Sequence, residues 1–410
     1  MPAIPAYYFM KAATWFSFMM VFTMAAIYRI ELVGLGPLEL ILVGTALELA
    51  IFLCEIPTGV VADVHSRRLS ITLGFAVMGL GCWLEILVPS FAMVVIAQVV
   101  FGAGYTLLSG AEDAWLADEI GEERLTGVML RGQQVQQLAS LAGIAASVGL
   151  AHADRRLPFF VAGCLLLLMA PVLRWLMPET GFRPTPTHER SSWAQLRDTL
   201  ERGVRTTRRS AFLVTMMAVA LCYGLSSEGL DRLWEAHLLE HFTFPGLGPL
   251  PAITWFGLIH AAAMVATLVF GEFVRRRAEH LDHRTTALLL GAESVLMVAG
   301  LLAFAFAGSF WLAIGAYVGV YAVRHIGQPV RIAWINRRLT PETRATVLST
   351  VNQMDAAGQL GGGPAVGLVG RGFGLRIALA TVAVLLMPLW GLYARAYGQD
   401  QRQDSSPGTR

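Results

Sequence analysis

The sequence predicts an all-α membrane protein in which twelve transmembrane helices form two six-helix bundles with the same orientation. Three observations support this fold class. Apolar residues gather in blocks of roughly 20, the length at which a helix crosses a hydrocarbon core of about 30 Å. The two halves of the chain repeat each other, and one long polar stretch separates them.

The composition favours a membrane protein over a soluble one. The 410 residues are 55% hydrophobic and 15% charged, with a mean hydropathy of +0.57, whereas soluble domains carry about 25% charged residues. Because a bilayer offers no hydrogen bonds to the backbone, blocks of this length must be helices. The net charge of +2 gives no strong attraction for nucleic acid, so we expect none as a partner.

The apolar blocks divide the chain into four segments. Residues 1–177 form the first bundle, 178–210 a cytoplasmic linker, 211–396 the second bundle and 397–410 a polar cytoplasmic tail, of which we expect residues 399–410 to be disordered. In the linker, Trp193, Leu196, Leu200 and Val204 recur at helical spacing, which predicts an amphipathic helix. The predicted membrane helices cover residues 8–29, 38–61, 69–89, 91–117, 126–150, 157–177, 211–231, 251–273, 285–307, 310–335, 345–370 and 375–396.

The arginines predict the orientation in the membrane. If the N-terminus faces the cytoplasm, most loop arginines fall in cytoplasmic loops, and few, such as Arg29, fall outside. This bias and the even number of helices place both termini in the cytoplasm. The first apolar block is too long for a secretion signal. We therefore expect a multi-pass protein of the inner cell membrane.

An internal repeat relates the two halves. The sequence GLGPL occurs at residues 34–38 and again at 246–250. A second match runs without gaps at a constant offset and pairs Trp115 with Trp334 and Gly143 with Gly362. Equivalent segments six helices apart keep the same orientation, so the repeat is parallel. Such proteins place a site between their halves and expose it alternately to the two sides of the membrane.

A charged motif ends the second predicted helix. Gly59 is expected to let two helices approach closely. Asp63 stands at a helix C-terminus, where the dipole disfavours an anion, so it needs a cationic partner such as Arg67 or Arg68. These residues predict a charge-stabilised turn at the cytoplasmic surface.

This motif resembles the loop signature of the major facilitator superfamily, G-x-x-x-D-x-x-G-R-R, with Ser66 where glycine is usual and with slightly altered spacing. Residues 55–59 (EIPTG) and 178–180 (PET) resemble the drug-efflux branches, including macrolide and tetracycline efflux relatives. The resemblance implies a secondary transporter, commonly monomeric, with no cofactor. Gln98 stands where many drug:proton antiporters carry an arginine, four residues before a glycine, so another residue would supply that role.

The repeat also predicts a latch between the halves. In the superfamily, an acidic residue at the end of the fourth helix helps to lock the cytoplasmic gate, and Asp118 and Glu119 occupy that place. At the offset of the gapless match, their counterparts are Arg337 and Arg338, and the counterpart of Glu112 is Arg331. We expect acid in one half to pair with base in the other; ordinary solvated loop charges are the alternative.

Ionisable residues inside membrane helices are costly, so each is a candidate for the substrate or proton pathway. Asp113 and Asp355 are the leading candidates because both lie in repeated helices. Structural ion pairing is the alternative for each. Lys11, near a helix end, is expected to extend toward the membrane surface. The further candidates are Glu228, Asp231 and Arg232, with Glu228 and Arg232 at pairing distance, and then Glu48 and Arg324.

Three functions are compatible with these features. The first is proton-coupled export of hydrophobic drugs or metabolites, because the predicted interior combines carboxylates with aromatic and methionine side chains. The second is import or facilitated passage of a small polar solute, and the third is a non-transporting sensor. Lys11 is the single lysine and has no Walker A context, and HExxH is absent, so we expect no enzyme.

The latch makes a prediction of its own. Asp118→Arg should reduce transport, because it would set two positive charges against each other. Arg337→Asp in the same chain should restore part of the transport, because it re-creates a pair of opposite sign. Transport assays on the two single variants and the double variant test this expectation, and a double variant no better than Asp118→Arg alone would contradict it.

Overall fold

The computed structural model describes residues 2–183, 207, 210–248, 250–278, 282–339 and 341–404. The regular elements in these ranges are helices, and one isolated bridge pairs Leu247 with Leu250. The predicted linker helix with Trp193, Leu196, Leu200 and Val204 lies outside the described residues.

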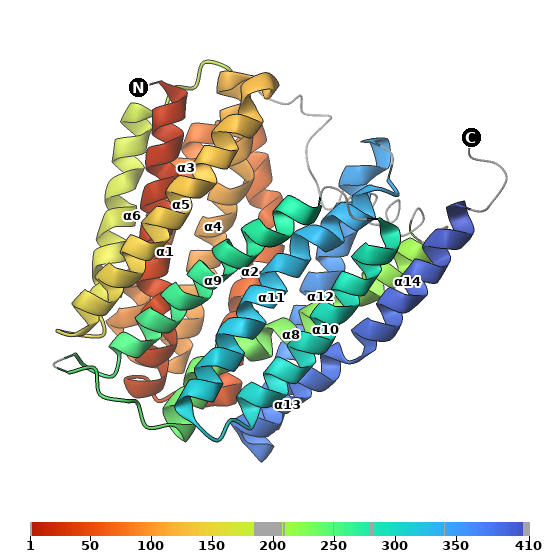
Figure 1. Cartoon of the computed structure of the whole chain (residues 1–410). Helices are drawn as coiled ribbons and strands as arrows, with labels where there is room; N and C mark the ends of the chain where they lie inside the picture. The colour runs from red at the N-terminus through yellow and green to blue at the C-terminus, as the bar shows by residue number, and fades with distance from the viewer. Residues whose placement is uncertain are drawn as a thin grey trace. The chain divides into compact units, whose positions relative to one another are not determined.

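Each predicted membrane helix has a counterpart in the structure (Figure 1). The first half contains α1 (Ala3–Glu31), α2 (Pro37–Val64), α3 (Arg67–Leu87), α4 (Phe91–Ile120), α5 (Glu122–Ala151) and α6 (Leu157–Leu176). The second half contains α8 (Ala211–His241), α9 (Thr254–Ala278), α10 (His283–Ala305), α11 (Phe310–Asn336), α12 (Pro341–Phe373), α13 (Leu375–Leu386) and α14 (Pro388–Asp404).

The structure corrects three helix boundaries. The last predicted helix is divided at Met387, because Pro388 cannot donate a hydrogen bond to the preceding turn. The helix expected to end at residue 231 continues to His241, so Asp231 lies inside α8 and not at its end. The polar tail is helical as far as Asp404 and not disordered from residue 399.

Five helices begin with the same local signal. The residue before the helix has an oxygen side chain that accepts a hydrogen bond from the backbone N–H three residues later, which satisfies a donor that the helix cannot pair. These residues are Ser66, Ser90, Ser210, Asp282 and Ser309. At α10, hydrogen bonds from the side chain and backbone of Thr285 lower the pKa of the exposed Asp282 carboxyl.

Nine stretches of the described residues are helical, long and apolar enough to cross a membrane, and α13 and α14 together provide one of them. The helices that do not meet this criterion are α5, α11 and α12. They carry clusters of glutamine, asparagine and charged residues, such as Arg331 in α11 and Asp355 in α12. In membrane helices such residues mark functional positions.

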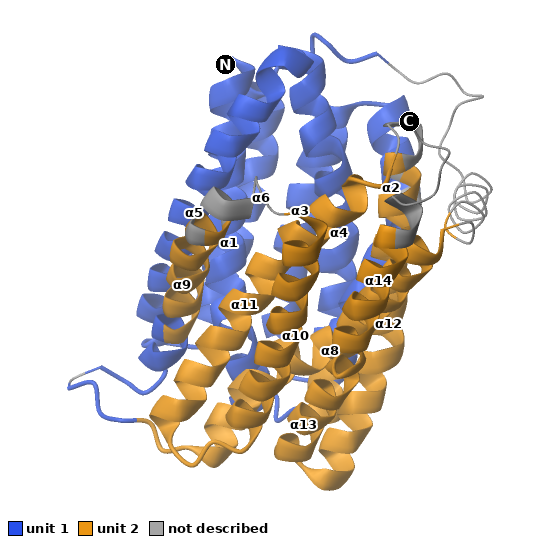
Figure 2. Cartoon of the chain, turned by 45° about the vertical axis from the view of Figure 1, so that its right-hand side comes forward, with its two compact units in different colours: residues 1–35, 42–196, 245–258 blue, residues 36–41, 197–244, 259–410 orange. Residues whose placement is uncertain are grey.

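The chain divides into two compact units, drawn in blue and orange in Figure 2. Unit 1 comprises residues 1–35, 42–196 and 245–258, and unit 2 comprises residues 36–41, 197–244 and 259–410. The first turns of α2 therefore belong to unit 2, and those of α9 belong to unit 1. The first GLGPL sequence includes the start of α2, and the second ends shortly before the start of α9.

The two units pack their helices in the same order. In unit 1, α3 packs on α4 and α6, and α1 packs on α5 and α6. In unit 2, α10 packs on α11, α13 and α14, and α8 packs on α12, α13 and α14. With α13 and α14 counted as one helix, these are the same pairs. The common packing confirms the internal repeat.

Glycines make close helix contacts at equivalent places in the two units. A Cβ on Gly143 of α5 would overlap the carbonyl oxygen of Phe16 in α1, and a Cβ on Gly362 of α12 would overlap that of Leu225 in α8. Small residues allow helix backbones to approach each other this closely. Gly59 differs from the expectation, because a Cβ there would meet no described atom within 4 Å.

Adjacent glycines of α12 allow a controlled test of this packing. Gly362→Ala should destabilise the protein by about 1–3 kcal/mol, because the added methyl group meets backbone and not a flexible side chain. Gly361→Ala is the matched control, since a Cβ at Gly361 has no described atom within 4 Å. Thermal unfolding in detergent measures both, and equal melting temperatures would contradict the assigned contact.

Candidate functional site

The charged motif joins α2, α3 and α4 within unit 1. Arg67 lies 3.4 Å from Asp63, one turn earlier, and its Nε lies 2.6 Å from an Asp118 carboxylate oxygen of α4. Arg67 therefore connects the end of α2 with the end of α4. The expectation that Asp63 needs a cationic partner is confirmed, and that partner is Arg67.

Ser66 replaces the usual glycine for a structural reason. Its φ of −176° is extended backbone, which any residue adopts. Its hydroxyl oxygen accepts a hydrogen bond from the Leu69 N–H at 2.9 Å and donates to Glu179, 2.7 Å away. The Arg68 N–H also donates to Glu179, at 2.9 Å. The PET segment after α6 therefore holds the start of α3.

A second acidic residue fixes the same segment. The Glu119 carboxylate accepts hydrogen bonds from the Thr180 N–H at 2.6 Å and from the Gly181 N–H at 2.8 Å. The indole N–H of the buried Trp115 donates to the Pro178 carbonyl oxygen at 2.8 Å. The end of α4 thus holds the chain that leaves α6.

Unit 2 uses the equivalent end of α11 in a similar way. Trp334, the counterpart of Trp115, donates its indole N–H to the Asp400 carboxylate at 3.3 Å. Asp400 is fully buried in α14 and also contacts Arg338 and His283 through its carboxylate. In both units, the tryptophan and a charged residue at this helix end hold the last helix of the unit or the segment that follows it.

A buried ion pair connects α1 and α4 in unit 1. Lys11 Nζ lies 3.0 Å from Glu112 Oε2 and 5.4 Å from the centre of the Tyr7 ring. The other Glu112 oxygen, Oε1, is buried and has no hydrogen-bond partner among the described residues. Lys11 therefore turns into the bundle and not toward the membrane surface. The neighbour of Glu112 in sequence, Asp113, is exposed.

A second buried network in unit 1 was not predicted. Arg29 lies in α1, is only 4% exposed and pairs with Glu85 of α3 at 2.8 Å, so it is not an outer-loop arginine. Gln98 of α4 donates to the other Glu85 oxygen at 2.7 Å. Gln98 thus contacts the Glu85 carboxylate, which already forms an ion pair with Arg29. No sequence signal links α1 with α3, because Arg29 and Glu85 are far apart in the chain.

A buried network of unit 2 surrounds Glu293 of α10. Its Oε1 accepts hydrogen bonds from Arg331 of α11 at 2.7 Å and from the Tyr223 hydroxyl of α8 at 3.0 Å. The Arg331 guanidinium lies 3.8 Å from the centre of the Tyr223 ring. A Cβ on Gly327 would overlap the Glu293 carboxylate. Gly327 therefore provides the space that the acid occupies.

The two networks occupy related positions in the repeat. The GLGPL match relates Lys11 to Tyr223, and the gapless match relates Glu112 to Arg331. The Lys11–Glu112 contact of unit 1 thus corresponds to the Tyr223–Arg331 contact of unit 2. The charge is therefore reversed between the matched residues, because Glu112 is an acid and Arg331 is a base. In unit 2 the acid comes from a third helix, as Glu293.

Further charges of unit 2 are paired. Arg324 of α11 donates two hydrogen bonds to Asp231 of α8, at 2.7 and 3.0 Å. Arg232 lies 3.2 Å from Glu228 within α8, which confirms the pair predicted from their spacing. The structure therefore brings together four of the predicted pathway residues as two ion pairs.

A polar cavity of about 110 Å³ lies inside unit 2, between α8, α11 and α12. Its apolar wall includes Met216, Val219 and Ile332. Its polar lining consists of Tyr223, Gln328, Arg331, Asn352 and Asp355. Small-molecule sites combine apolar walls with a few convergent polar groups in this way.

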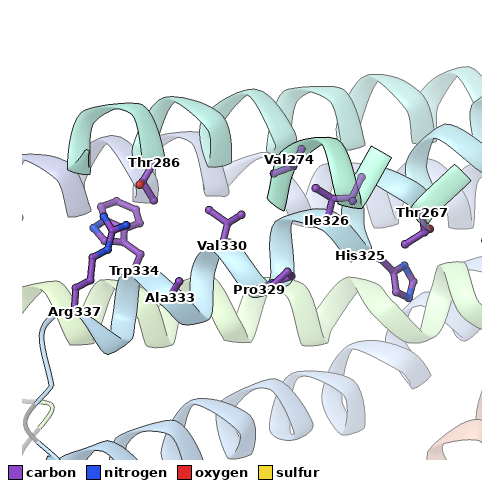
Figure 3. Close-up of a pocket in the computed structure, with 11 residues that line it drawn as sticks. Thr267, Val274, Thr286, His325, Ile326, Pro329, Val330, Ala333, Trp334 and Arg337 are labelled. Atoms are coloured by element: carbon purple, nitrogen blue, oxygen red, sulfur yellow. The ribbon is translucent and has the colours of Figure 1, made fainter. Parts of the chain in front are cut away.

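A second cavity of unit 2, of about 190 Å³, is more apolar (Figure 3). It lies between α9, α10 and α11, with Val330 and Ala333 along its length, Arg337 near Trp334 at one end and His325 at the other. Of these two cavities, only the polar one has a carboxylate among the described residues of its lining. The polar cavity is therefore the stronger candidate for a site that binds ions as well as hydrocarbon.

Comparison with known proteins gives the family. The sequence profile of the Major Facilitator Superfamily matches residues 7–324. The chain belongs to the Major Facilitator Superfamily. It is 23% identical over 360 residues to YxaM of Bacillus subtilis (strain 168), described as an uncharacterized MFS-type transporter, and the match covers 85% of each chain. It is therefore a multi-pass membrane transporter and not an enzyme.

Solved structures share the fold of this superfamily member. The bacterial homolog of the human lysosomal transporter Spinster, inward-facing and unoccupied, has a TM-score of 0.78 at 14% identity, over 99% of this chain and 98% of that one. The nucleoside transporter NupG has a TM-score of 0.76 at 11% identity, covering 97% and 99%. A POT family transporter in complex with 5-aminolevulinic acid gives 0.76 at 12%, covering 97% and 96%. The drug-efflux branch is not distinguished by these matches.

The structure places the other predicted residues as follows. Asp355 lines the polar cavity, and its Oδ2 accepts a hydrogen bond from Gln359 at 2.7 Å. Glu48 is half-buried in α2. Arg337 lines the apolar cavity. Sequence reasoning missed the roles of Lys11 and Glu293, because their partners depend on helix rotations that spacing does not reveal.

The Glu293 network yields a stability prediction. Arg331→Met should destabilise the protein by roughly 3–5 kcal/mol, because it leaves a buried acid without its base. Adding Glu293→Gln should recover a large part, since the double variant contains no unpaired charge. Thermal unfolding of both single variants and the double variant measures the coupling, and strictly additive losses would show that the two residues do not interact.

Proposed function

We propose that this protein is a secondary active transporter that works by alternating access and couples the export of hydrophobic drugs or metabolites to protons. The observation that carries the proposal is the polar cavity of unit 2, where an apolar wall meets the carboxylate of Asp355. Hydrocarbon of a substrate suits the wall, and an acid that gains and loses a proton supplies the coupling.

Two neighbouring acids of α4 are the proposed proton site of unit 1. Glu112 is buried beside Lys11 and has one oxygen with no described partner, which a proton would satisfy. Asp113 is exposed on the same helix and provides a route by which a proton reaches Glu112. The ion pairs Asp231–Arg324 and Glu228–Arg232, with Glu48 of α2, would set the electrostatic field along the pathway.

The charged motif is the proposed cytoplasmic gate. Asp63, Arg67 and Asp118 form a chain of contacts that holds the ends of α2, α3 and α4 together, and Arg68 and Gly59 belong to the same turn. Asp118 is also the residue whose counterpart in the repeat is Arg337, so the latch requires it to exchange Arg67 for Arg337 during the cycle. This assignment implies cytoplasmic termini and an inner-membrane location, and a monomer suffices for it.

A second candidate function is import or facilitated passage of a small polar solute. The polar lining of the same cavity favours it, because Gln328, Arg331 and Asn352 supply hydrogen-bond donors beside Asp355. Export and import differ in the sign of the flux that the protein produces in cells.

Efflux of fluorescent hydrophobic dyes, cationic and neutral, tests the proposal. Cells that produce the wild-type protein should retain less dye than control cells, and a proton uncoupler should abolish the difference. Glu112→Gln and Asp113→Asn should reduce the efflux rate by about tenfold or more, which corresponds to an increase of about 1.4 kcal/mol or more in the activation free energy of transport. Asp154→Asn, an exposed acid in the turn between α5 and α6, serves as the matched control.

Dye retention equal to that of control cells for every dye would reject hydrophobic export. Efflux that persists with the uncoupler would reject the proton coupling and leave the export. Uptake of a polar solute in place of dye efflux would favour the second candidate.

A further inference from the structure

Among the described residues, the charge network around the polar cavity of unit 2 holds one acid more than it holds bases. The acids are Asp231 of α8, Glu293 of α10 and Asp355 of α12, and the bases are Arg324 and Arg331 of α11. Two of the acids use both bases, in the pairs Asp231–Arg324 and Glu293–Arg331, each at 2.7 Å. Asp355 remains without a base of its own in this network.

The groups that face Asp355 do not remove this excess. From α11, Arg324 and Arg331 attract it, and from α8, Asp231 repels it. Both arginines are committed elsewhere, since Arg324 donates twice to Asp231. Arg331 donates to Glu293 and stacks on the uncharged Tyr223, which also lines the cavity. On its own helix, Asp355 accepts a hydrogen bond from the neutral Gln359 amide.

An uncompensated charge among membrane helices is costly, so the cavity favours an occupant that brings one positive charge. The side-chain amides of Gln328 and Asn352 face the cavity and have no partner among the described residues. They are available to a polar substituent. Met216, Val219 and Ile332 form an apolar wall for the rest of a ligand.

An anion fits the same cavity poorly. Arg331 is the only base among the described residues of its lining, and its Nη1 and one face are already used by Glu293 and Tyr223. An anion there would also meet the carboxylate of Asp355. The excess negative charge at the cavity therefore favours a positively charged ligand.

We propose that the polar cavity of unit 2 binds the exported substrate as a monovalent organic cation, with its positive group at Asp355, and that a proton occupies this carboxylate when the cation is absent. This inference rests on the proposed export function and adds the substrate class to it. A carboxylate that holds either a proton or a cation, but not both, makes exchange of the two obligatory at one group.

The exchange has a defined pH dependence. The cation binds the ionised carboxylate, so its apparent affinity falls as the pH falls and the proton competes. Below the titration of Asp355 the loss approaches about tenfold per pH unit, and above it the affinity is constant. In a weakly buffered solution at low pH, binding of a cation should release about one proton per site.

The test uses the purified full-length protein in detergent and two small aromatic probes. Benzyltrimethylammonium carries a fixed positive charge, and phenylacetate is an anion of similar size. The wild-type protein should bind the cation in preference to the anion by about tenfold or more and should release a proton as it binds. Because the quaternary ammonium group does not titrate, any proton released comes from the protein.

Variants locate the effect. Asp355→Asn should lose about tenfold or more in affinity for the cation and should release no proton, whereas Asp355→Glu should retain both properties. Glu272→Gln is the matched control, because Glu272 is a membrane-helix carboxylate of α9 that does not line the cavity. Size-exclusion profiles confirm that each variant is folded.

Two results would overturn the inference. They are cation binding by the wild-type protein without proton release, and unchanged affinity in Asp355→Asn. Both differ from failure of the proposed function. If dyes are exported but neither cation binding nor proton release depends on Asp355, the assigned site is wrong and export stands. If the cation binds with proton release but no dye leaves cells, the site stands and hydrophobic export is wrong.

Discussion

The cost of placing a charge among apolar helices determines where the polar residues of both units lie. The buried acids of the three central networks are accompanied by a base from another helix, in Lys11–Glu112, Arg29–Glu85 and Arg331–Glu293. These pairs fix how the helices are rotated, because a rotation would separate the partners and leave both charges unpaired. Hydrophobic packing holds the helices together, but lipid is as apolar as their side chains and does not select one rotation over another.

The repeat shows how one scaffold holds two kinds of network. The position of Glu112 in α4 corresponds to that of Arg331 in α11, and both contact the first helix of their own unit. In unit 1 the first helix supplies a base, and in unit 2 it supplies the aromatic ring of Tyr223. The acid of unit 2, Glu293, then comes from α10, and Gly327 of α11 leaves room for it. Both halves therefore have a contact between their first and fourth helices. They differ in the charge of the residue on the fourth helix and in the helix that supplies the acid.

The sequence was sufficient for those features that depend on short-range pattern or on the repeat. Block length predicts the helices, the one-turn spacing predicts the Glu228–Arg232 pair, and the gapless match predicts the shared roles of Gly143 and Gly362. It was insufficient where the partner is distant. Glu85 and Arg29 are ordinary members of two apolar blocks until the fold brings α1 and α3 together. The extension of α8 to His241 was missed because its last turns carry charges that are typical of a loop.

The same reasoning explains why Asp355 is the exception. Arg331 cannot serve it without abandoning Glu293, whose carboxylate fills the space beside Gly327 and would then be buried and unpaired. Arg324 cannot serve it without releasing a two-point contact with Asp231. The first exchange would move the unpaired charge from the lining of a cavity to the buried Glu293, where a ligand or a proton would reach it less easily. The arrangement of the two arginines thus keeps the uncompensated acid at the cavity, which is the position in which its charge can be neutralised reversibly.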